Sequence, residues 1–315
     1  MIPKSFLPVI RTAVLIILVL GSVMGGKRIV STHDALDTPP ATVEAVDVTP
    51  TEPAIVDLTE TEAPRPTDPP LQPTAAPTLE PTVAPTQEPA QQGRGEFPVP
   101  ENTTGRSIVI ERGPEDKKYI ALTFDAGEGR GYTEEILDLL KEHGLHASFG
   151  TTGQWARENP DLVNRILDEG HLLFNHSESH QSWTGVSPQT EPLTVEERTA
   201  EVQGAHDSVL EVADWNMQPF WRPPYGDMDA EGQELLASMG YDYTFWWTCD
   251  TLAWTGVSAE EIAASCASDT DKGGPGAIIL MHVAQEQDYL ALEALIADYQ
   301  SEGYEFVTLN MMIGD

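Results

Sequence analysis

The sequence predicts an α/β fold, a distorted (β/α) barrel with about seven parallel strands, for the part of the chain that follows residue 105. Two observations support this fold class. Short apolar runs alternate with amphipathic segments, a pattern typical of a βα repeat and a largely parallel sheet. The segment is also roughly two hundred residues long, which is within the range of a single barrel.

Seven apolar runs are predicted to form the strands. They lie at residues 119–124, 147–151, 172–175, 220–223, 243–249, 277–282 and 305–309. Helices are predicted between them at about 133–143, 160–169, 194–213, 229–239, 258–268 and 287–301. Capping chemistry supports two helix starts, because Thr133 precedes an acidic first turn and Ser258 stands three residues before Glu261, the capping-box spacing.

The first hundred residues are not predicted to be globular. Lys4 and Arg11 precede an apolar stretch at residues 13–24, so residues 1–30 have the layout of a secretory signal peptide or an uncleaved signal anchor. Residues 31–105 are rich in Pro, Thr and acidic residues, with too few large apolar side chains to form a core, and are predicted to be a disordered linker. The folded domain, residues 106–315, is therefore expected outside the cytoplasm, membrane-anchored or secreted and associated with the wall.

The net charge and the cysteine content exclude some classes of binding partner and of metal site. A formal net charge of −34 argues against binding to nucleic acid or to an anionic membrane face, because both would be repelled. A neutral partner fits better. Two cysteines, Cys249 and Cys266, are too few and too far apart for a zinc knuckle. They form a disulfide if their segments face each other, and otherwise they are two small buried residues.

Reactive side chains follow the ends of five predicted strands. These residues are Asp125, His176, Arg222 with Tyr225, Asp250 with Trp254, and His282. Because the carboxyl ends of parallel strands meet at one face of the fold, we expect these side chains to lie close together. Core packing does not explain why five separate segments deliver polar groups to the same face.

The stretch NHSESH places His176 and His180 four residues apart. This spacing puts both imidazoles on one side if the chain turns helically there, as in many zinc sites, and the alternative is a pair of solvated histidines on a loop. The histidines outside the strand ends are interpreted as non-catalytic; they are His143, His146, His171 and His206.

These segments resemble, in order and spacing, the five motifs of the polysaccharide deacetylases with a nodulation-protein-B homology domain, carbohydrate esterase family 4. The matching stretches are TFDAG (123–127), HSESH (176–180), RPPYG (222–226), DTLAW (250–254) and LMH (280–282). The likeness covers about residues 108–312. It implies a metal-dependent hydrolase that removes N-acetyl groups from peptidoglycan or another glycan of N-acetylglucosamine or N-acetylmuramic acid. The implied metal is divalent, commonly zinc, with cobalt and manganese as alternatives.

The resemblance also implies three catalytic residues and two metal ligands. Asp125 would be the general base that takes a proton from water, and His282 the general acid that protonates the leaving amine. Arg222 would orient Asp125 and keep it ionised, because a neighbouring cation favours the charged carboxylate. His176 and His180 would be the metal ligands. Hydrolysis of an amide needs an activated water, an acid and a charge sink, and this set supplies them.

The resemblance assigns substrate binding to a second group of residues. The resemblance implies that the backbone amide of Tyr225 donates to the oxyanion and that Trp254 and Leu280 wall the pocket for the acetate methyl group. Asp250, which opens the fourth motif, is assigned to the same substrate-binding set.

The sequence departs from the family pattern at two positions. Family members usually carry a metal-binding aspartate at the position of Ala126, and commonly an acid that tunes the catalytic histidine at the position of Ala253. The third protein ligand of the metal is therefore uncertain. The candidates for the missing oxygen are Glu128, Glu178 and Asp227, and Asp250 is a candidate to reach His282.

Two other functions stay open at this point. One is a catalytically impaired surface module that binds glycan without turnover, which the two alanines favour. The other is an O-acetyl xylan esterase, because the motifs do not separate amide from ester substrates. The sequence leaves the oligomeric state open, and a membrane contact would run through the N-terminal segment if it is not cleaved.

Overall fold

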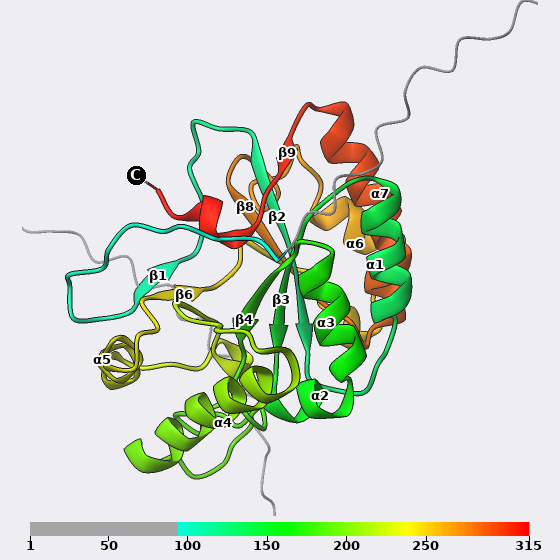
Figure 1. Ribbon diagram of the computed structural model, residues 1–315. Coiled ribbons are helices and arrows are strands. Elements are labelled where there is room, and N and C mark those ends of the chain that lie inside the picture. Colours follow the sequence, from blue (N-terminus) through cyan, green and yellow to red (C-terminus); the bar gives the residue numbers. More distant parts are fainter. Residues whose placement is uncertain (1–93, 315) are drawn as a thin grey trace, which may run out of the picture. The chain divides into compact units, whose positions relative to one another are not determined.

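The computed structural model describes residues 94–314. The predicted signal segment and most of the predicted linker lie outside the described residues. The described part forms a parallel sheet with helices packed around its outer face (Figure 1). Every recorded strand pair is parallel, which confirms the predicted fold class. Within residues 94–314, no helix is both long enough and apolar enough to span a bilayer.

The strands and helices alternate along the chain. The strands are β1 (Ile108–Ile110), β2 (Tyr119–Ala126), β3 (Ser148–Thr151), β4 (Leu172–Asn175), β5 (Phe220–Trp221), β6 (Tyr243–Phe245), β7 (Cys249–Asp250), β8 (Ala277–His282) and β9 (Glu305–Phe306). The helices are α1 (Thr133–Glu142), α2 (Gly153–Glu158), α3 (Pro160–Asp168), α4 (Val195–Ala213), α5 (Ala230–Ser238), α6 (Ala259–Ser265) and α7 (Glu286–Ser301). Three short 3₁₀ helices, η1 (Pro224–Gly226), η2 (Ala253–Thr255) and η3 (Leu309–Met312), complete this part of the chain.

The sheet has the order β1-β6-β5-β4-β3-β2-β8-β7, with β9 beside β2. The strand predicted at 243–249 is two strands, because the chain changes partners within it. β6 pairs with β1 and β5, whereas β7 pairs with β8. Between them the backbone N–H of Trp246 donates to the carbonyl of Ile110, and the N–H of Thr248 donates to that of Ile278. The segment thus bridges the two ends of the sheet, which distorts the barrel.

Local differences from the sequence prediction have simple causes. β1 is only three residues long and half-buried, so it gives little apolar signal. α2 begins directly after β3, where the Thr152 side chain accepts from the backbone N–H of Trp155. Thr133 is the first residue of α1 rather than its cap, and its hydroxyl donates to the carbonyl of Arg130. The predicted capping box of Ser258 and Glu261 is confirmed.

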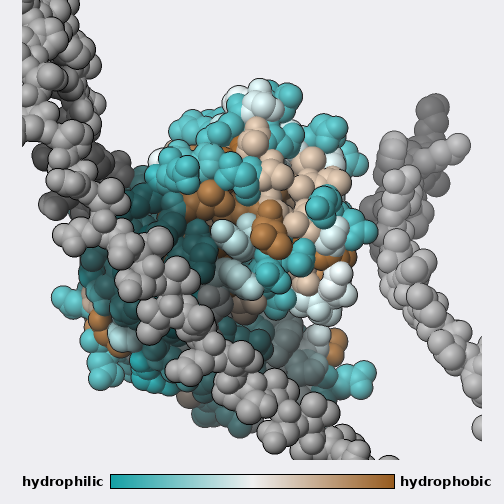
Figure 2. Space-filling view, turned by 90° about the vertical axis from the view of Figure 1, so that its right-hand side faces the viewer, coloured by the Kyte–Doolittle hydropathy of each residue, from teal (hydrophilic) through white to brown (hydrophobic). Residues whose placement is uncertain are grey.

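The alternation of β2 sets the direction of the site. Leu122 and Phe124 point to the apolar cluster under the helices, while Ala121 belongs to the cluster inside the barrel. Because side chains alternate along a strand, Asp125 faces the barrel interior on the same side as Ala121. The outer surface differs: the face shown in Figure 2 is largely hydrophilic, with apolar residues gathered near its middle.

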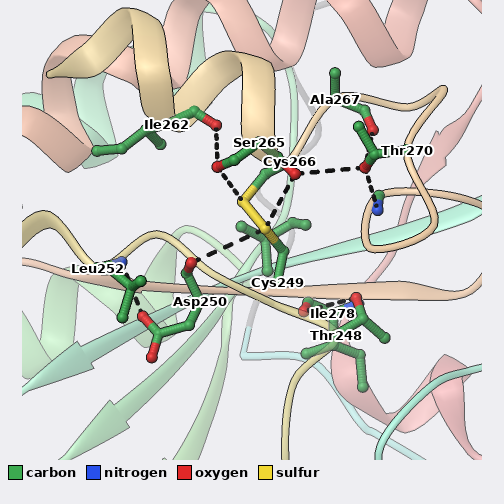
Figure 3. Close-up of a disulfide and its surroundings, with 12 residues drawn as sticks. Thr248, Cys249, Asp250, Leu252, Ile262, Ser265, Cys266, Ala267, Thr270 and Ile278 are labelled. Carbon is green, nitrogen blue, oxygen red and sulfur yellow. Dashed lines mark hydrogen bonds between the residues drawn. A yellow bond between two sulfur atoms is a disulfide. The ribbon is translucent and has the colours of Figure 1, made fainter. Parts of the chain in front are cut away.

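Cys249 and Cys266 form a disulfide, so of the two alternatives the bonded one is confirmed. Both cysteines are fully buried. The bond joins the start of β7 to the residue that follows α6 (Figure 3). It closes a loop that carries Asp250 and η2, and therefore fixes the base of the wall on which Trp254 stands.

The described residues that precede β1 pack against the domain. The Arg94 guanidinium donates to Asn164 Oδ1 at 2.6 Å and to Asp168 Oδ1 at 3.1 Å. The Phe97 ring meets that of Trp215 edge-on, with the centroids 6.4 Å apart. The end of the predicted linker is therefore in contact with α3 and with the segment that follows α4.

Candidate active site

A cleft of about 720 Å³ lies at the carboxyl ends of the strands. Eight of the nine predicted site residues line it: Asp125, His176, His180, Tyr225, Asp250, Trp254, Leu280 and His282. Arg222, the ninth, is fully buried beside Asp125. A second cavity, of about 520 Å³, lies between residues 94–98 and β4 and β5, and none of the predicted site residues lines it. The strand ends therefore converge as the sequence predicted.

Asp125 and Arg222 form a buried ion pair. Arg222 Nη1 donates to Asp125 Oδ1 at 2.9 Å and to Thr123 Oγ1 at 3.0 Å. Its Nε donates to the carbonyl of Phe245 at 3.1 Å. The guanidinium also lies over the Phe174 ring at 5.0 Å, so its position is determined by β2, β4 and β6 together. A buried guanidinium with this many partners is a fixed counter-ion for the carboxylate.

The electrostatic balance keeps Asp125 ionised. Burial alone would raise its pKa, but the charge and hydrogen bond of Arg222, together with smaller contributions from His176 and His282, outweigh this effect. The pKa of Asp125 therefore lies below the ordinary value of an aspartate. At neutral pH this side chain presents a carboxylate to the cleft, which is the form a general base needs.

His176 and His180 lie on a loop rather than a helix. Ser177 and His180 both have positive φ, 68° and 59°, a conformation that is uncommon for residues other than glycine. Side chains hold this conformation: Asn175 Oδ1 accepts from the N–H of Ser177, and Ser177 Oγ accepts from the N–H of His180, both at 2.9 Å. The Glu201 carboxylate accepts from the backbone and the hydroxyl of Ser179. Backbone strain held by so many partners is typical of a functional loop.

The two imidazoles are oriented as a pair. Their ring centroids are 4.9 Å apart. His176 Nδ1–H donates to the carbonyl of Arg222 at 2.9 Å, which leaves Nε2 without a proton, 3.4 Å from Asp125 Oδ2. Burial lowers the pKa of His176 and brings that of His180 to about 3. Two neutral imidazoles, one fixed by a backbone carbonyl, are the state in which histidines bind a metal.

The third ligand expected in this family pattern is missing. Ala126 is fully buried within the apolar cluster under the helices. Glu178 is paired with Arg157 and Ser208, and Asp227 accepts from Ser182 and Thr184, so both are engaged away from the cleft.

Among the three candidates for the missing oxygen, only Glu128 lines the cleft. Within residues 94–314 no three His, Cys, Asp or Glu side chains converge as a metal site. His176 and His180 are therefore the side chains that would hold a cation in this cleft, where it would supply a Lewis acid.

His282 stands on the wall of the cleft that β8 forms next to β2. It ends β8, directly beside Asp125 in the sheet register, and its side chain is 31 % exposed. Burial lowers its pKa, but the carboxylates of Asp288 and Asp125 outweigh this effect, with a smaller contribution from Asp250, so the pKa lies above the ordinary value of histidine. The raised pKa favours the protonated imidazole, the form that a general acid requires.

Asp250 does not bind His282 in the way considered from the sequence. Its Oδ1 accepts from the backbone N–H of Leu252 at 2.9 Å, a contact visible in Figure 3. Burial raises the pKa of Asp250. This side chain shapes the turn that precedes η2 while it lines the cleft.

Aromatic and apolar side chains form the rim. Trp254 is 64 % exposed and Tyr225 is 47 % exposed, whereas Leu280 is buried at the floor. The Tyr225 ring packs edge-on against His180 with the centroids 4.6 Å apart, and Tyr225 itself has a positive φ of 60°. Large exposed rings beside a polar cleft are typical of sites that bind a flat, amphipathic ligand such as a sugar ring.

Sequence reasoning missed several residues of the site. Trp247 lines the cleft, and Asp288 accepts from the backbone N–H of His282. Trp247 stands in the unusual run FWWTC, where consecutive aromatic residues signal that one of them faces a cavity. Asp288 lies in a helix, six residues after its partner, and no motif pointed to it.

Comparison with known proteins gives a consistent result. Residues 112–244 match the family model described as polysaccharide deacetylase. A peptidoglycan-N-acetylglucosamine deacetylase of Bacillus cereus is 32 % identical over 204 residues, which cover 64 % of this chain and 70 % of the relative. The peptidoglycan-N-acetylmuramic acid deacetylase PdaA of Bacillus subtilis is 28 % identical over 194 residues, covering 62 % of this chain and 71 % of the relative.

A third similar protein is a solved structure with a different description. It is a pseudoenzyme of carbohydrate esterase family 4 from Bacillus anthracis, with a TM-score of 0.58 and 25 % identity over 66 % of this chain and 69 % of that one. A mutant with restored enzymatic activity gives the same TM-score at 26 % identity, over 66 % of this chain and 71 % of the mutant. Similar structures thus include both active and inactive proteins.

Proposed function

Because the chain belongs to the polysaccharide deacetylases of carbohydrate esterase family 4, we propose that it removes N-acetyl groups from a cell-wall glycan of N-acetylglucosamine or N-acetylmuramic acid units. The observation that carries the proposal is the position of Asp125, which pairs with the buried Arg222 at the cleft and lies beside His282 in the sheet register. The two groups provide a base and an acid on neighbouring strands.

These two residues suffice for the proton transfers of amide hydrolysis. Asp125 takes a proton from a water molecule as the water oxygen attacks the acetyl carbonyl carbon. His282 then gives its proton to the nitrogen as the carbon–nitrogen bond breaks, which releases acetate and leaves a free amine on the sugar. The pKa of Asp125 is lowered and that of His282 is raised, which favours the carboxylate and the imidazolium that the two roles require.

Binding groups surround this pair. The backbone of Tyr225, held at positive φ at the cleft, would donate to the developing oxyanion, and Leu280 with Trp254 would enclose the acetyl methyl group. The exposed ring of Trp254 would also support a sugar ring at the mouth of the cleft.

We further propose that His176 and His180 hold a divalent cation, zinc or else cobalt or manganese. When bound there, such an ion would polarise the acetyl carbonyl and lower the pKa of a bound water. With two protein ligands and an alanine at position 126, the affinity is expected to be lower than that of a three-ligand site.

An extracytoplasmic location is part of the proposal. It rests on the signal-like residues 1–30 and on the disulfide between Cys249 and Cys266, because disulfides persist in oxidising compartments. A wall-bound glycan is the substrate that such a location makes available.

Acetate release from an N-acetylglucosamine oligomer, from a peptide-free glycan that contains N-acetylmuramic acid and from acetylated xylan tests the proposal. The full chain is stripped with a chelator and then supplied with zinc, cobalt or manganese. Release from either N-acetylated glycan is the expected result. Release from xylan alone would show an O-acetyl esterase and overturn the proposal.

Ala126 favours a second candidate, glycan binding without turnover, because it removes the usual metal-binding carboxylate while the cleft and its aromatic rim persist. The likeness to a pseudoenzyme of the same family is in line with this alternative. Calorimetric titration with an N-acetylglucosamine oligomer separates the two. A pure binding module shows affinity that Asp125→Asn leaves intact and no acetate from the parent protein.

A further inference from the structure

The catalytic histidine faces a buried carboxylate that no motif of the sequence includes. Asp288 is fully buried in the first turn of α7. Its Oδ2 accepts from the backbone N–H of His282 at 2.7 Å and lies 3.8 Å from His282 Nδ1. Among the described residues, His282 is the only cationic side chain within ion-pair distance of this carboxylate.

Both groups have unused hydrogen-bonding capacity. In the described part of the chain, His282 Nδ1 and Asp288 Oδ1 are buried polar atoms without a hydrogen-bond partner. Leaving a buried donor or acceptor without a partner costs free energy, and this cost is larger for a charged group. A small rotation of the imidazole would bring Nδ1–H within hydrogen-bonding distance of Asp288 Oδ2, now 3.8 Å away, and a carboxylate oxygen can accept a second hydrogen bond beside that from the His282 backbone N–H.

The location of Asp288 explains how it can take over a missing function. Ala253, where family members commonly carry an acid that tunes the histidine, lies on η2, and η2 packs against α7. Asp288 therefore approaches His282 from the helix that adjoins the altered position. The first turn of a helix also favours a negative charge, which makes a buried anion tolerable there.

We propose that Asp288 is a positioning residue that binds Nδ1–H of His282, turns Nε2 toward the cleft and stabilises the protonated imidazole in place of the acid absent at position 253. The inference rests on the proposed function, in which His282 is the general acid. Asp288 does not touch the substrate: it acts through the histidine.

Other charged groups also face His282, and their effects on its pKa must be distinguished from that of Asp288. Asp125 approaches from β2 and Asp250 from β7, and both favour the imidazolium. His176 faces it from the loop after β4, and an imidazolium at position 282 lowers the pKa of His176. Asp288 contributes most to the raised pKa of His282, which identifies it as the group to change.

The test replaces Asp288 by Asn, which keeps an acceptor for the His282 N–H and removes the charge. Glu286→Gln is the matched control, because Glu286 is an exposed acid in the same helical turn. Asp288→Asn is expected to lower kcat about 10- to 100-fold, as expected when a general acid is poorly oriented, and to shift the alkaline limb of the pH profile to lower pH. Glu286→Gln should leave both unchanged.

A rescue variant and a direct titration complete the experiment. Ala253→Asp in the Asp288→Asn background is expected to restore part of kcat, because the acid returns from the neighbouring η2. The imidazole of His282 is also titrated by NMR in metal-free protein, where its pKa should fall in Asp288→Asn. Circular dichroism establishes that each variant is folded, and if Asp288→Asn is not, the same titration is made on Asp288→Glu, which should keep the raised pKa.

An unchanged His282 titration and pH profile in Asp288→Asn would overturn the proposal. The NMR titration needs no turnover, so it distinguishes two failures. If no glycan is hydrolysed by the parent protein, the proposed function fails, while a shifted His282 pKa still supports the pairing.

Discussion

The two walls of the cleft hold their key residues in different ways. On the β2 side, Asp125 has a direct partner at 2.9 Å, the guanidinium of a fully buried arginine that also donates to Thr123 on β2 and to a backbone carbonyl of β6. On the β8 side, His282 has no partner at Nδ1, and the nearest carboxylate is 3.8 Å away on a helix. The proposed base is fixed within the sheet, whereas the proposed acid depends on a helix that packs against it.

This difference shows which positions can change without loss of the site. A group held by a network of strand residues loses its charge balance when one partner is lost. A group whose partner comes from an adjoining helix can exchange one carboxylate for another. His282 is an example, because position 253 is an alanine and Asp288 supplies an acid instead. We expect substitutions on the Asp125 wall to have the larger effects.

Asp125→Asn is predicted to have the largest effect on activity. The variant removes the base but keeps a hydrogen-bond acceptor for Arg222, so acetate release should fall about 10²–10⁴-fold while the fold persists. Initial rates of acetate release, with the fold followed by circular dichroism, measure this. A variant that keeps a tenth or more of the activity would show that Asp125 is not the base.

Arg222→Met is predicted to have the largest effect on stability. It leaves the buried Asp125 without its cation, which costs about 3–5 kcal/mol in the free energy of unfolding. Urea unfolding measures the loss, and the double variant with Asp125→Asn should recover part of it. Asp288→Asn should cost less, because the N–H of His282 keeps its acceptor. Equal losses on both walls would contradict the comparison.

His180→Ala is predicted to abolish most zinc binding. With two imidazoles as the protein ligands, loss of one should weaken the affinity by more than about a hundredfold, the upper end of what loss of a hydrogen-bonding partner behind a ligand costs. Calorimetry with zinc alone measures it, with His206→Ala as a control outside the cleft. Unchanged affinity would place the metal elsewhere.

His171→Gln tests a pH dependence of the free energy of unfolding that arises outside the cleft, independently of Asp125 and His282. Burial lowers the pKa of His171 to about 3, below its ordinary value of 6.5. Between these values the unfolded chain binds one more proton than the folded one, so this contribution to stability is present above pH 6.5 and is lost as the pH falls. From pH 7 to pH 5 the loss is about 2 kcal/mol.

Urea unfolding at both pH values measures this loss. Gln at position 171 can still accept from the N–H of Ala147, as His171 Nδ1 does, but it does not titrate. The free energy of unfolding of the parent, relative to that of His171→Gln, should therefore fall as the pH falls. A difference that is independent of pH would contradict the assignment.

Much of the fold and site followed from the sequence because both depend on local patterns. Apolar runs such as those of β2 and β8 mark strands, and a polar residue directly after each marks the cleft. Asp288 was not predictable in this way, because its partner is fixed only when α7 packs against η2. The break between β6 and β7 was missed for the same reason: a change of pairing partner leaves no trace in a continuous apolar run.

The sequence also could not predict that Glu178 and Asp227 are bound to other side chains. Both are acids next to motif residues, so each qualified as a metal ligand by position. Their partners, Arg157 and Ser182, are decided by the packing of α2 and of the loop after the histidines. The side chains that surround an acid, rather than its place in a motif, decide its role.

The most direct test of the account is acetate release by the parent chain and by Ala126→Asp, measured side by side against metal concentration. We expect the parent to release acetate from an N-acetylated glycan at high metal concentration, and the added carboxylate to lower the concentration needed. Zinc calorimetry and circular dichroism establish that both proteins are folded and loaded. If the parent releases no acetate at any metal concentration while Ala126→Asp does, this cleft is not catalytic as it stands.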